Sequence, residues 1–315
     1  CSSPSSSRSR CAGRAPSVRV LVTGSAGFVG GHLVEALRGA GHTVLTVDLH
    51  EMPAPLSFRA DVRTLAPERV PAFDVCVHLA SDVGGFLHNA EDHGLEAYEA
   101  ELFEGVRRLC QHHRARLVYV SSIAVFEAGG DFSHRPLARL DQRTPYARAK
   151  ARAEQLVTAA FDDFAIVRPT NIFGPSQRRA GDRAGESHVI PDLLHKIAHA
   201  PRLEVLGDGE QLRNFIHVAD VVSFLRLAVE RPARGFFNLR SDIQLRIGAL
   251  AGILLHLADQ AKEIVYRPDY LRYEPRPIEL FSLDAPFALG WRPRVTDLAA
   301  GLADERHDVA LASNA

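Results

Sequence analysis

Two side chains with complementary acid–base chemistry, Tyr146 and Lys150, stand four residues apart in a stretch that predicts a helix. Residues four apart share one face of a helix, so the Lys150 ammonium would lie beside the Tyr146 phenol. A neighbouring positive charge favours the phenolate and lowers the pKa of a tyrosine from about 10 toward neutrality. Tyr146 could then act as a general base. An ordinary surface pair is the alternative that this spacing alone leaves open.

A hydroxyl group that could share this chemistry follows the predicted strand 117–121. Ligands of open α/β sheets bind at the carboxyl ends of strands, so Ser122 would lie within reach of the same substrate hydroxyl as Tyr146. A serine that only caps the end of the strand is the alternative.

A glycine-rich turn near the amino end predicts an anion site. It lies between an apolar strand at 18–23 and an amphipathic helix at 28–38, and it reads Thr23-Gly24-Ser25-Ala26-Gly27-Phe28-Val29-Gly30. The glycines permit a tight turn and a close backbone approach to a pyrophosphate, and the start of the helix presents free N–H groups to the anion.

A carboxylate at the end of the next predicted strand, 43–47, indicates which anion binds. Asp48 follows the turn by about 20 residues, where an acidic side chain accepts hydrogen bonds from the ribose hydroxyls of a dinucleotide. Its charge would repel the 2′-phosphate of NADP, so the pattern favours NAD. We therefore predict an NAD site that includes Gly24, Ala26, Gly27, Phe28, Val29, Gly30 and Asp48.

Strands alternate with helices through the first half of the chain. Further strands are predicted at 74–80, 117–121 and 164–167, and further helices at 96–112 and 146–161. This alternation is typical of an α/β fold with a doubly wound, mostly parallel Rossmann sheet. After Pro169 the connections are rich in Pro, Gly and Arg, which predicts a smaller C-terminal substrate-binding lobe.

These patterns also predict the division of the chain into domains. We expect an NAD-binding domain at 17–172 with returning segments near 213–240, and a lobe made by 173–212 and 241–302. Residues 1–16 are rich in Ser, Arg and Pro without an apolar period, which predicts a disordered tail, and we expect a flexible C-terminus at 303–315.

The composition excludes several classes of protein. With 315 residues, 46% hydrophobic content and a net charge of -1, the chain is no small disulfide scaffold and has no global field for nucleic acid or an anionic membrane. Its apolar runs are shorter than the about 18 residues of a membrane span. The four cysteines show no CxxC pairing, and His195 and His199 lack an evident third ligand, so we expect no metal. A cytoplasmic protein is the resulting expectation.

Several motifs follow one another in a fixed order: the turn at 23–30, His78-Leu79-Ala80, Val118-Tyr119-Val120-Ser121-Ser122, Tyr146-Ala147-Arg148-Ala149-Lys150 and Arg168-Pro169-Thr170-Asn171-Ile172-Phe173-Gly174-Pro175. Together they resemble the extended short-chain dehydrogenase/reductase family, and within it the NAD-dependent nucleotide-sugar epimerase/dehydratase branch. The resemblance runs from about Val18 to Leu302.

The resemblance implies roles for further residues. NAD would also contact Tyr146, Lys150, Asp61, Val62, Leu79, Ala80 and Ser81. A UDP-, GDP- or dTDP-sugar would contact Asp82, Val83, Ser122, Asn171, Val189, Arg213 and Arg276. The two arginines would pair with the diphosphate, because a guanidinium group suits phosphate geometry. A homodimer through helices 96–112 and 146–161 is expected by analogy.

The resemblance also implies a reaction. In this branch the base takes the proton of the C4 hydroxyl while the C4 hydride passes to NAD, leaving a 4-keto sugar. Dehydratases and decarboxylases of the branch carry acidic residues close to the catalytic hydroxyl residue, whereas this chain has Ile123 and Ala124 after Ser122. We therefore expect a 4-epimerase of the UDP-glucose or UDP-glucuronate type, in which the keto sugar rotates and hydride returns to its other face.

Departures from the branch keep alternatives open. Glu127 stands where the branch usually has Gly, Glu101 stands where it usually has Asn, and Asp82 begins a segment similar to the Gly-Gly loop of 3,5-epimerases. A 3,5-epimerase, a dehydratase and a 4-keto-sugar reductase therefore stay possible, although a reductase commonly uses NADPH, which Asp48 opposes. A non-catalytic nucleotide sensor would normally lose Tyr146 or Lys150, and both are present.

Overall fold

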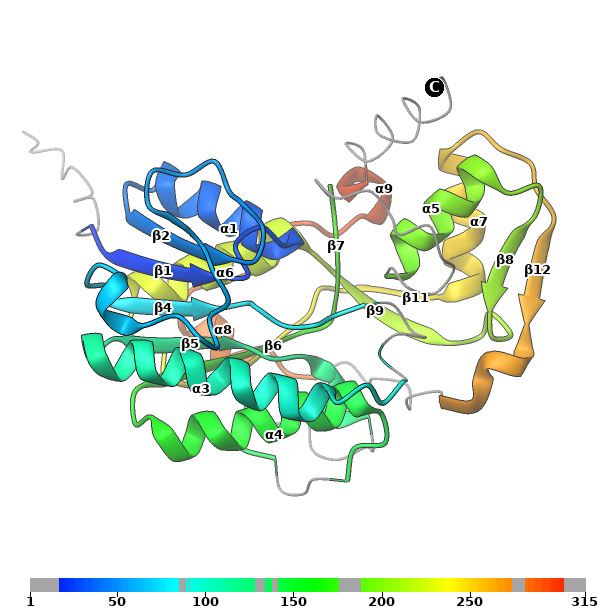
Figure 1. Ribbon diagram of the computed structural model, residues 1–315. Coiled ribbons are helices and arrows are strands. Elements are labelled where there is room, and N and C mark those ends of the chain that lie inside the picture. The colour runs from blue at the N-terminus through cyan, green and yellow to red at the C-terminus, as the bar shows by residue number, and fades with distance from the viewer. Residues whose placement is uncertain are drawn as a thin grey trace, which may run out of the picture.

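The computed structural model describes residues 17–84, 89, 91–127, 134–137, 141–175, 188–273 and 281–302. A seven-stranded sheet in the order β10-β6-β5-β4-β1-β2-β3 forms its centre (Figure 1). All strand pairs in this sheet are parallel. The strands are β1 Arg19–Thr23, β2 Thr43–Asp48, β3 Ser57–Arg59, β4 Val75–His78, β5 Arg116–Val120, β6 Phe164–Pro169 and β10 Gly235–Leu239. The predicted doubly wound α/β fold is thus confirmed.

Helices cover both faces of the sheet. The helices α1 Phe28–Gly39 and α6 Val218–Glu230 pack on one face, and α3 Leu95–His113 and α4 Pro145–Ala160 pack side by side on the other (Figure 1). Successive side chains of a strand point to opposite faces. Val20 and Val22 of β1 accordingly join the core under α1 and α6, whereas Leu21 joins the core under α3 and α4.

The strand β4 is shorter than the predicted span 74–80. Its last register pair joins His78 to Thr23, the final residue of β1. Beyond that point the neighbouring chain turns into the glycine-rich loop, so Leu79 and Ala80 have no strand to pair with and form the connection at the carboxyl edge of the sheet.

The helix α4 begins where local chemistry favours a start. The Thr144 hydroxyl accepts a hydrogen bond from the backbone N–H of Ala147 at 3.3 Å, and Pro145 occupies the first helical position. The threonine cap satisfies one backbone N–H that has no partner within the helix, and proline at the first helical position has no N–H to satisfy. Both favour a helix start at this point, which places Tyr146 in the first turn.

A second group of elements forms a smaller lobe beside the sheet's carboxyl edge (Figure 1). It contains the strand orders β11-β9-β7 and β12-β8. Its elements are β7 Asn171–Phe173, α5 Val189–His199, β8 Leu203–Leu206, β9 Leu212–His217, β11 Ile243–Arg246, α7 Ile247–Leu257, β12 Ile264–Arg267 and α9 Leu298–Gly301. Phe173, Leu193, Phe215, Leu250 and Leu298 share one hydrophobic core. This separate core supports the lobe boundary that we propose near residue 173.

Short helical segments complete the described chain: η1 Pro67–Arg69, η2 Ile123–Phe126, η3 Pro268–Tyr273 and α8 Asp284–Ala288. Within the described ranges, no helix combines the length and the apolar content that crossing a membrane requires.

Two helix glycines give a matched test of the packing between α3 and the segment that follows β3. A Cβ atom at Gly105 would stand 2.2 Å from the Val62 carbonyl oxygen, whereas one at Gly252 in α7 would meet no atom within 4 Å. We expect Gly252→Ala to raise the free energy of unfolding by about 0.5 to 1 kcal/mol through helix propensity. Gly105→Ala should lower it by a net of about 1 to 2 kcal/mol, because a steric cost of about 1 to 3 kcal/mol outweighs that gain. Urea denaturation of both variants measures the difference, and stabilisation by Gly105→Ala would contradict the close packing.

Candidate active site

The structure brings the three residues with predicted acid–base chemistry to the carboxyl edge of the sheet. Tyr146 and Lys150 lie one turn apart in α4, with the Lys150 Nζ 5.9 Å from the centroid of the Tyr146 ring. Ser122 follows β5 and caps η2, where its hydroxyl accepts from the backbone N–H of Ala124 at 3.2 Å. The Ser122 side chain also lies close enough to Tyr146 to lower the pKa of the phenol.

A buried carboxylate that the sequence analysis missed faces Lys150. Glu99 of α3 is 2% exposed, and its Oε2 lies 3.0 Å from the Lys150 Nζ. Its other oxygen, Oε1, accepts a hydrogen bond from the hydroxyl of Ser81. The spacing of α3 contains a signal that could have found it, because Glu99 falls on the same face as the buried Leu95, Leu102 and Val106.

The carboxylate changes the electrostatics expected for the phenol. Burial raises the pKa of Tyr146, the positive charge of Lys150 lowers it, and the negative charge of Glu99 raises it again, so the pKa lies above its usual value. Burial alone would lower the pKa of Lys150, but the charge and hydrogen bond of Glu99 together with the nearby Tyr119 and Tyr146 outweigh burial and raise that pKa. Burial is the largest of these effects, and the lowered Tyr146 pKa that we expect from Lys150 and a nearby nicotinamide cation stays a prediction for the site with NAD bound.

The glycine-rich turn fits closely against the end of β4. Gly24 has a φ of +69°, and a Cβ atom there would stand 2.5 Å from the backbone nitrogen of Ala80. One at Gly30 would stand 2.1 Å from the Gly24 carbonyl oxygen. Glycine at these positions thus lets the turn lie directly beside Leu79 and Ala80 and lets the first turn of α1 pack against the turn. Because a close backbone approach and a helix start are what a pyrophosphate requires, the residues present fit a dinucleotide.

The predicted ribose ligand lies beside this turn. The Asp48 carboxylate accepts from the backbone N–H of Ala26 at 2.9 Å through Oδ2 and from that of His50 at 2.9 Å through Oδ1. These bonds hold the carboxylate at the mouth of the turn, and each oxygen keeps a further lone pair for a ribose hydroxyl.

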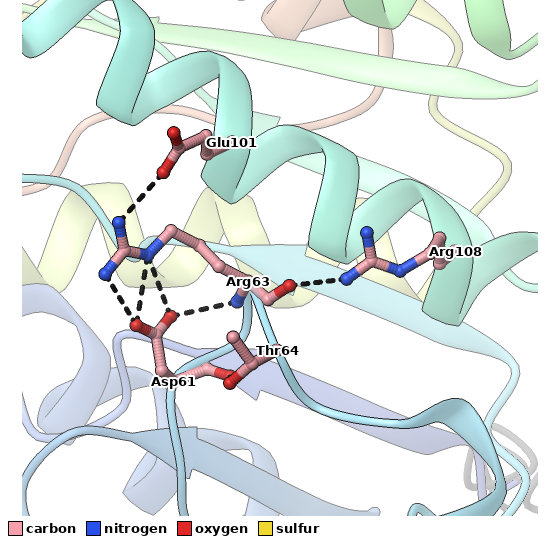
Figure 2. Close-up of polar contacts among 5 residues, drawn as sticks. All are labelled: Asp61, Arg63, Thr64, Glu101 and Arg108. Carbon is pink, nitrogen blue, oxygen red and sulfur yellow. Dashed lines mark hydrogen bonds and ion pairs between the residues drawn. The ribbon is translucent and has the colours of Figure 1, made fainter.

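The predicted adenine neighbour Asp61 is engaged by an arginine two residues on, as Figure 2 shows. The Arg63 Nη2 and Nε donate to Asp61 Oδ2 at 2.7 and 3.0 Å, and these bonds hold the pKa of Asp61 below its usual value. Glu101, which we noted in place of the usual Asn, accepts from the Arg63 Nη1 at 2.9 Å. The side chain of Glu101 therefore belongs to this surface network, and Val62 between Asp61 and Arg63 is 4% exposed.

Of the residues expected to hold the sugar nucleotide, Asn171 and Arg213 come together in the three-stranded sheet. Asn171 of β7 stands opposite Phe215 of β9, two residues beyond Arg213, and its Nδ2 donates to the Asn214 carbonyl at 2.9 Å. Val189 begins α5 in the same lobe.

The remaining expected sugar contacts lie elsewhere. Asp82 and Val83 lie in the loop after β4. Val83 is 41% exposed, and the Asp82 Oδ2 lies 3.2 Å from the His93 Nε2. Arg276 lies outside the described residues.

Glu127, a possible additional acid by sequence, contacts the start of α4. Its Oε1 accepts from the backbone N–H groups of Arg143 and Thr144, the latter at 2.5 Å, and its Oε2 accepts from the Thr144 hydroxyl at 2.7 Å. The carboxylate is thus committed to holding the N-terminus of the helix that carries Tyr146.

His195 and His199, for which the sequence indicated no third metal ligand, lie in the same helix. The rings of His195 and His199 lie 4.6 Å apart in α5. Among the described residues, no group of three or more His, Cys, Asp or Glu side chains is placed to hold a metal ion.

Comparisons with known proteins agree with this fold. Residues 20–239 match the model of the NAD dependent epimerase/dehydratase family. A dTDP-4-dehydro-6-deoxy-D-allose reductase of Streptomyces sp is 27% identical over 82% of this chain and 85% of its own. A UDP-glucose 4-epimerase of Mycolicibacterium smegmatis is also 27% identical, over 91% of this chain and 96% of its own.

A solved structure extends the similarity to the whole described fold. MoeE5 in complex with UDP-glucuronic acid and NAD superposes with a TM-score of 0.76 at 27% identity and covers 93% of this chain and 99% of its own. The family match spans more than half of the chain, and it agrees with the resemblance and the cofactor predicted from the sequence. The chain therefore belongs to the NAD-dependent epimerase/dehydratase family, whose nucleotide-sugar enzymes use NAD as their cofactor.

Proposed function

We propose that the protein is an NAD-dependent nucleotide-sugar 4-epimerase. The observation that carries this choice concerns the positions after Ser122, where a dehydratase or decarboxylase would need a further acid. Ile123 is buried and apolar, Ala124 has no ionisable group, and Glu127 is bound to three donors at the start of α4. A 4-epimerase needs no such acid, because one base serves both directions of its hydride transfer.

In the proposed reaction Tyr146 takes the proton of the C4 hydroxyl and later returns it to the same oxygen. Ser122, whose side chain lies beside Tyr146, would orient the C4 oxygen toward the phenol. Lys150 stabilises the phenolate through its positive charge. NAD, when bound, supplies the acceptor and donor of the C4 hydride and a positive ring that favours the phenolate. Gly24, Gly30 and Asp48 would hold its pyrophosphate and ribose.

A UDP-hexose or UDP-hexuronate is the substrate class that we propose. The support comes from the UDP-glucose 4-epimerase among the relatives and from the UDP-glucuronic acid bound to MoeE5. Arg213 and Asn171 would bind the diphosphate, since a guanidinium group and an amide donate hydrogen bonds to phosphate oxygens. Arg276 and Val189 stay predicted contacts of the same ligand.

A second candidate is reduction of a 4-keto sugar. The raised pKa of Tyr146 favours the protonated phenol, which suits donation of a proton to a C4 carbonyl. A relative with this type of activity is the dTDP-4-dehydro-6-deoxy-D-allose reductase. Asp48 still opposes NADPH, so such a reductase would draw on NADH.

The homodimer through α3 and α4 and the cytoplasmic location stay predictions.

Incubation with NAD and a panel of UDP-, GDP- and dTDP-hexoses and hexuronates in D₂O tests the proposed reaction. We expect a C4 epimer of unchanged mass from a UDP-sugar, because the hydride leaves and returns without exchanging with solvent. Mass spectrometry and proton NMR of the products measure this. Deuterium at C3 or C5 would support proton transfer by Asp82 instead, loss of water would indicate a dehydratase, and turnover only of keto sugars with NADH would indicate the reductase.

The variant Tyr146→Phe tests the proposed base. Removing the phenolic oxygen should lower turnover by about 10² to 10⁴ while leaving the dissociation constant of the sugar nucleotide nearly unchanged, since general acid–base help has this magnitude. Steady-state kinetics and calorimetric binding measure the two effects. Tyr270→Phe makes the same change at a surface position that is 36% exposed and serves as the control. Turnover of Tyr146→Phe at the wild-type rate would remove Tyr146 from the mechanism.

A further inference from the structure

The carboxylate of Glu99 has contacts that the proposed reaction does not use. One oxygen lies 3.0 Å from the Lys150 Nζ and the other accepts from the Ser81 hydroxyl. The side chains of Glu99 and Lys150 are 2% and 4% exposed. Both oxygens are therefore engaged, one by the residue that acts on the proposed base and one by the segment that follows β4.

The position of Glu99 in α3 is an unfavourable one for a carboxylate. The face that buries Glu99 is otherwise apolar and includes Leu95, Leu102, Phe103 and Val106. A carboxylate taken out of water at such a position costs more free energy than it returns unless a counter-charge and hydrogen bonds compensate it. An apolar side chain would pack at this position at a lower cost in free energy, so stability alone does not explain the charged side chain.

We propose that Glu99 is a positioning residue of the active site, which holds the Lys150 ammonium between α3 and β5 and ties it through Ser81 to the cofactor-lining segment after β4. This proposal rests on the proposed role of Tyr146 as the base. The Lys150 ammonium lies near two aromatic rings as well as the Glu99 carboxylate. Its Nζ stands 5.5 Å from the Tyr119 ring centroid and 5.9 Å from that of Tyr146.

The groups around Lys150 show how Glu99 acts on the phenol. From β5, Tyr119 is fully buried and its pKa is raised, so it stays neutral. From β4, burial lowers the pKa of His78 to about 3, and it also stays neutral. Among the described groups that act on Tyr146, Glu99 is the negative charge and Lys150 the positive one. Glu99 therefore cancels part of the attraction that would otherwise favour the phenolate.

This balance has a consequence for both proton transfers. With the Lys150 charge partly cancelled, Tyr146 keeps its proton to a higher pH than it would beside a lone ammonium, which aids its return to the C4 oxygen. Replacing the carboxylate by a neutral amide removes one of the two effects that raise the pKa of the phenol, while the Lys150 charge that lowers it stays. The phenol should then ionise at lower pH, because a nearby negative charge disfavours the phenolate.

The test is a titration of Tyr146 in the full chain, followed by the near-ultraviolet absorbance of its phenolate. Subtracting the same titration of a protein that also carries Tyr146→Phe isolates this one phenol. We expect Glu99→Gln to lower the midpoint, with and without NAD. The acidic limb of the kcat profile on the sugar substrate should move in the same direction, with little change in KM.

Two further variants keep the result decisive. Glu104→Gln makes the same charge change on α3 at an exposed carboxylate bound to Arg107, and it should leave the midpoint unchanged. Glu99→Asp withdraws the carboxylate from Lys150 by one methylene and should give a midpoint between those of the wild type and Glu99→Gln. If Glu99→Gln does not fold, Glu99→Asp decides. A midpoint at or above the wild-type value in the deciding variant overturns the proposal.

The titration separates this proposal from the proposed function, since it needs no sugar. A lowered midpoint in a protein that epimerises no sugar nucleotide would support the role of Glu99 and refute the epimerase. An unchanged midpoint in an active 4-epimerase would refute the role of Glu99 alone.

Discussion

A buried ammonium requires a counter-charge, and the catalytic half of this molecule is arranged around that requirement. Lys150 extends from α4 into the layer between α3 and the sheet, where its Nζ meets the Glu99 carboxylate at 3.0 Å. Removing one partner of a buried ion pair costs about 3 to 5 kcal/mol, whereas the whole fold is stable by about 5 to 15 kcal/mol. A single helix-propensity difference of up to about 1 kcal/mol cannot compete with this. Losing either of these two side chains would therefore leave the other charge buried without its partner and weaken the packing of α3 against α4.

A second buried pair one turn further along α4 anchors the helix again. Glu154 accepts from the fully buried Arg168 at 2.6 Å and from the Ser121 hydroxyl at 2.6 Å. Ser121 directly precedes Ser122, so this network connects the helix that carries Tyr146 with the strand end that carries its partner. With Glu127 at the first turn, α4 is held at its N-terminus and at two points of one face, which positions Tyr146 against Ser122.

Much of the fold and part of the site could be predicted from the sequence, because their signals are local. The turn from Gly24 to Gly30 and each of the alternating strands and helices occupy a short continuous stretch. The observed α3 and α4 differ from their predicted bounds by single residues. The predicted end of β4 was too late, since it depends on where β1, a different segment, stops.

The missed features all depend on contacts between distant segments. Glu99 acquires its role only because α4 brings Lys150 against α3, and nothing near Glu99 in sequence indicates this apart from its place on the apolar face. Glu127 was taken for a possible acid, but its partners at Arg143 and Thr144 lie on the other side of a connection. The sequence pattern indicates which side chains can do chemistry, whereas the packing of helices decides which of them already bind other protein groups.

In the proposed epimerase, one phenol supports both the removal and the return of a C4 hydride. A UDP-hexose that carries deuterium at C4, incubated in ordinary water with the protein and NAD, tests this when NMR locates the label in the product. We expect a C4 epimer that retains the deuterium at C4, because the hydride never leaves the site. A product that has lost the label to solvent, or one in which the configuration at C4 is unchanged while C3 or C5 is altered, would contradict it.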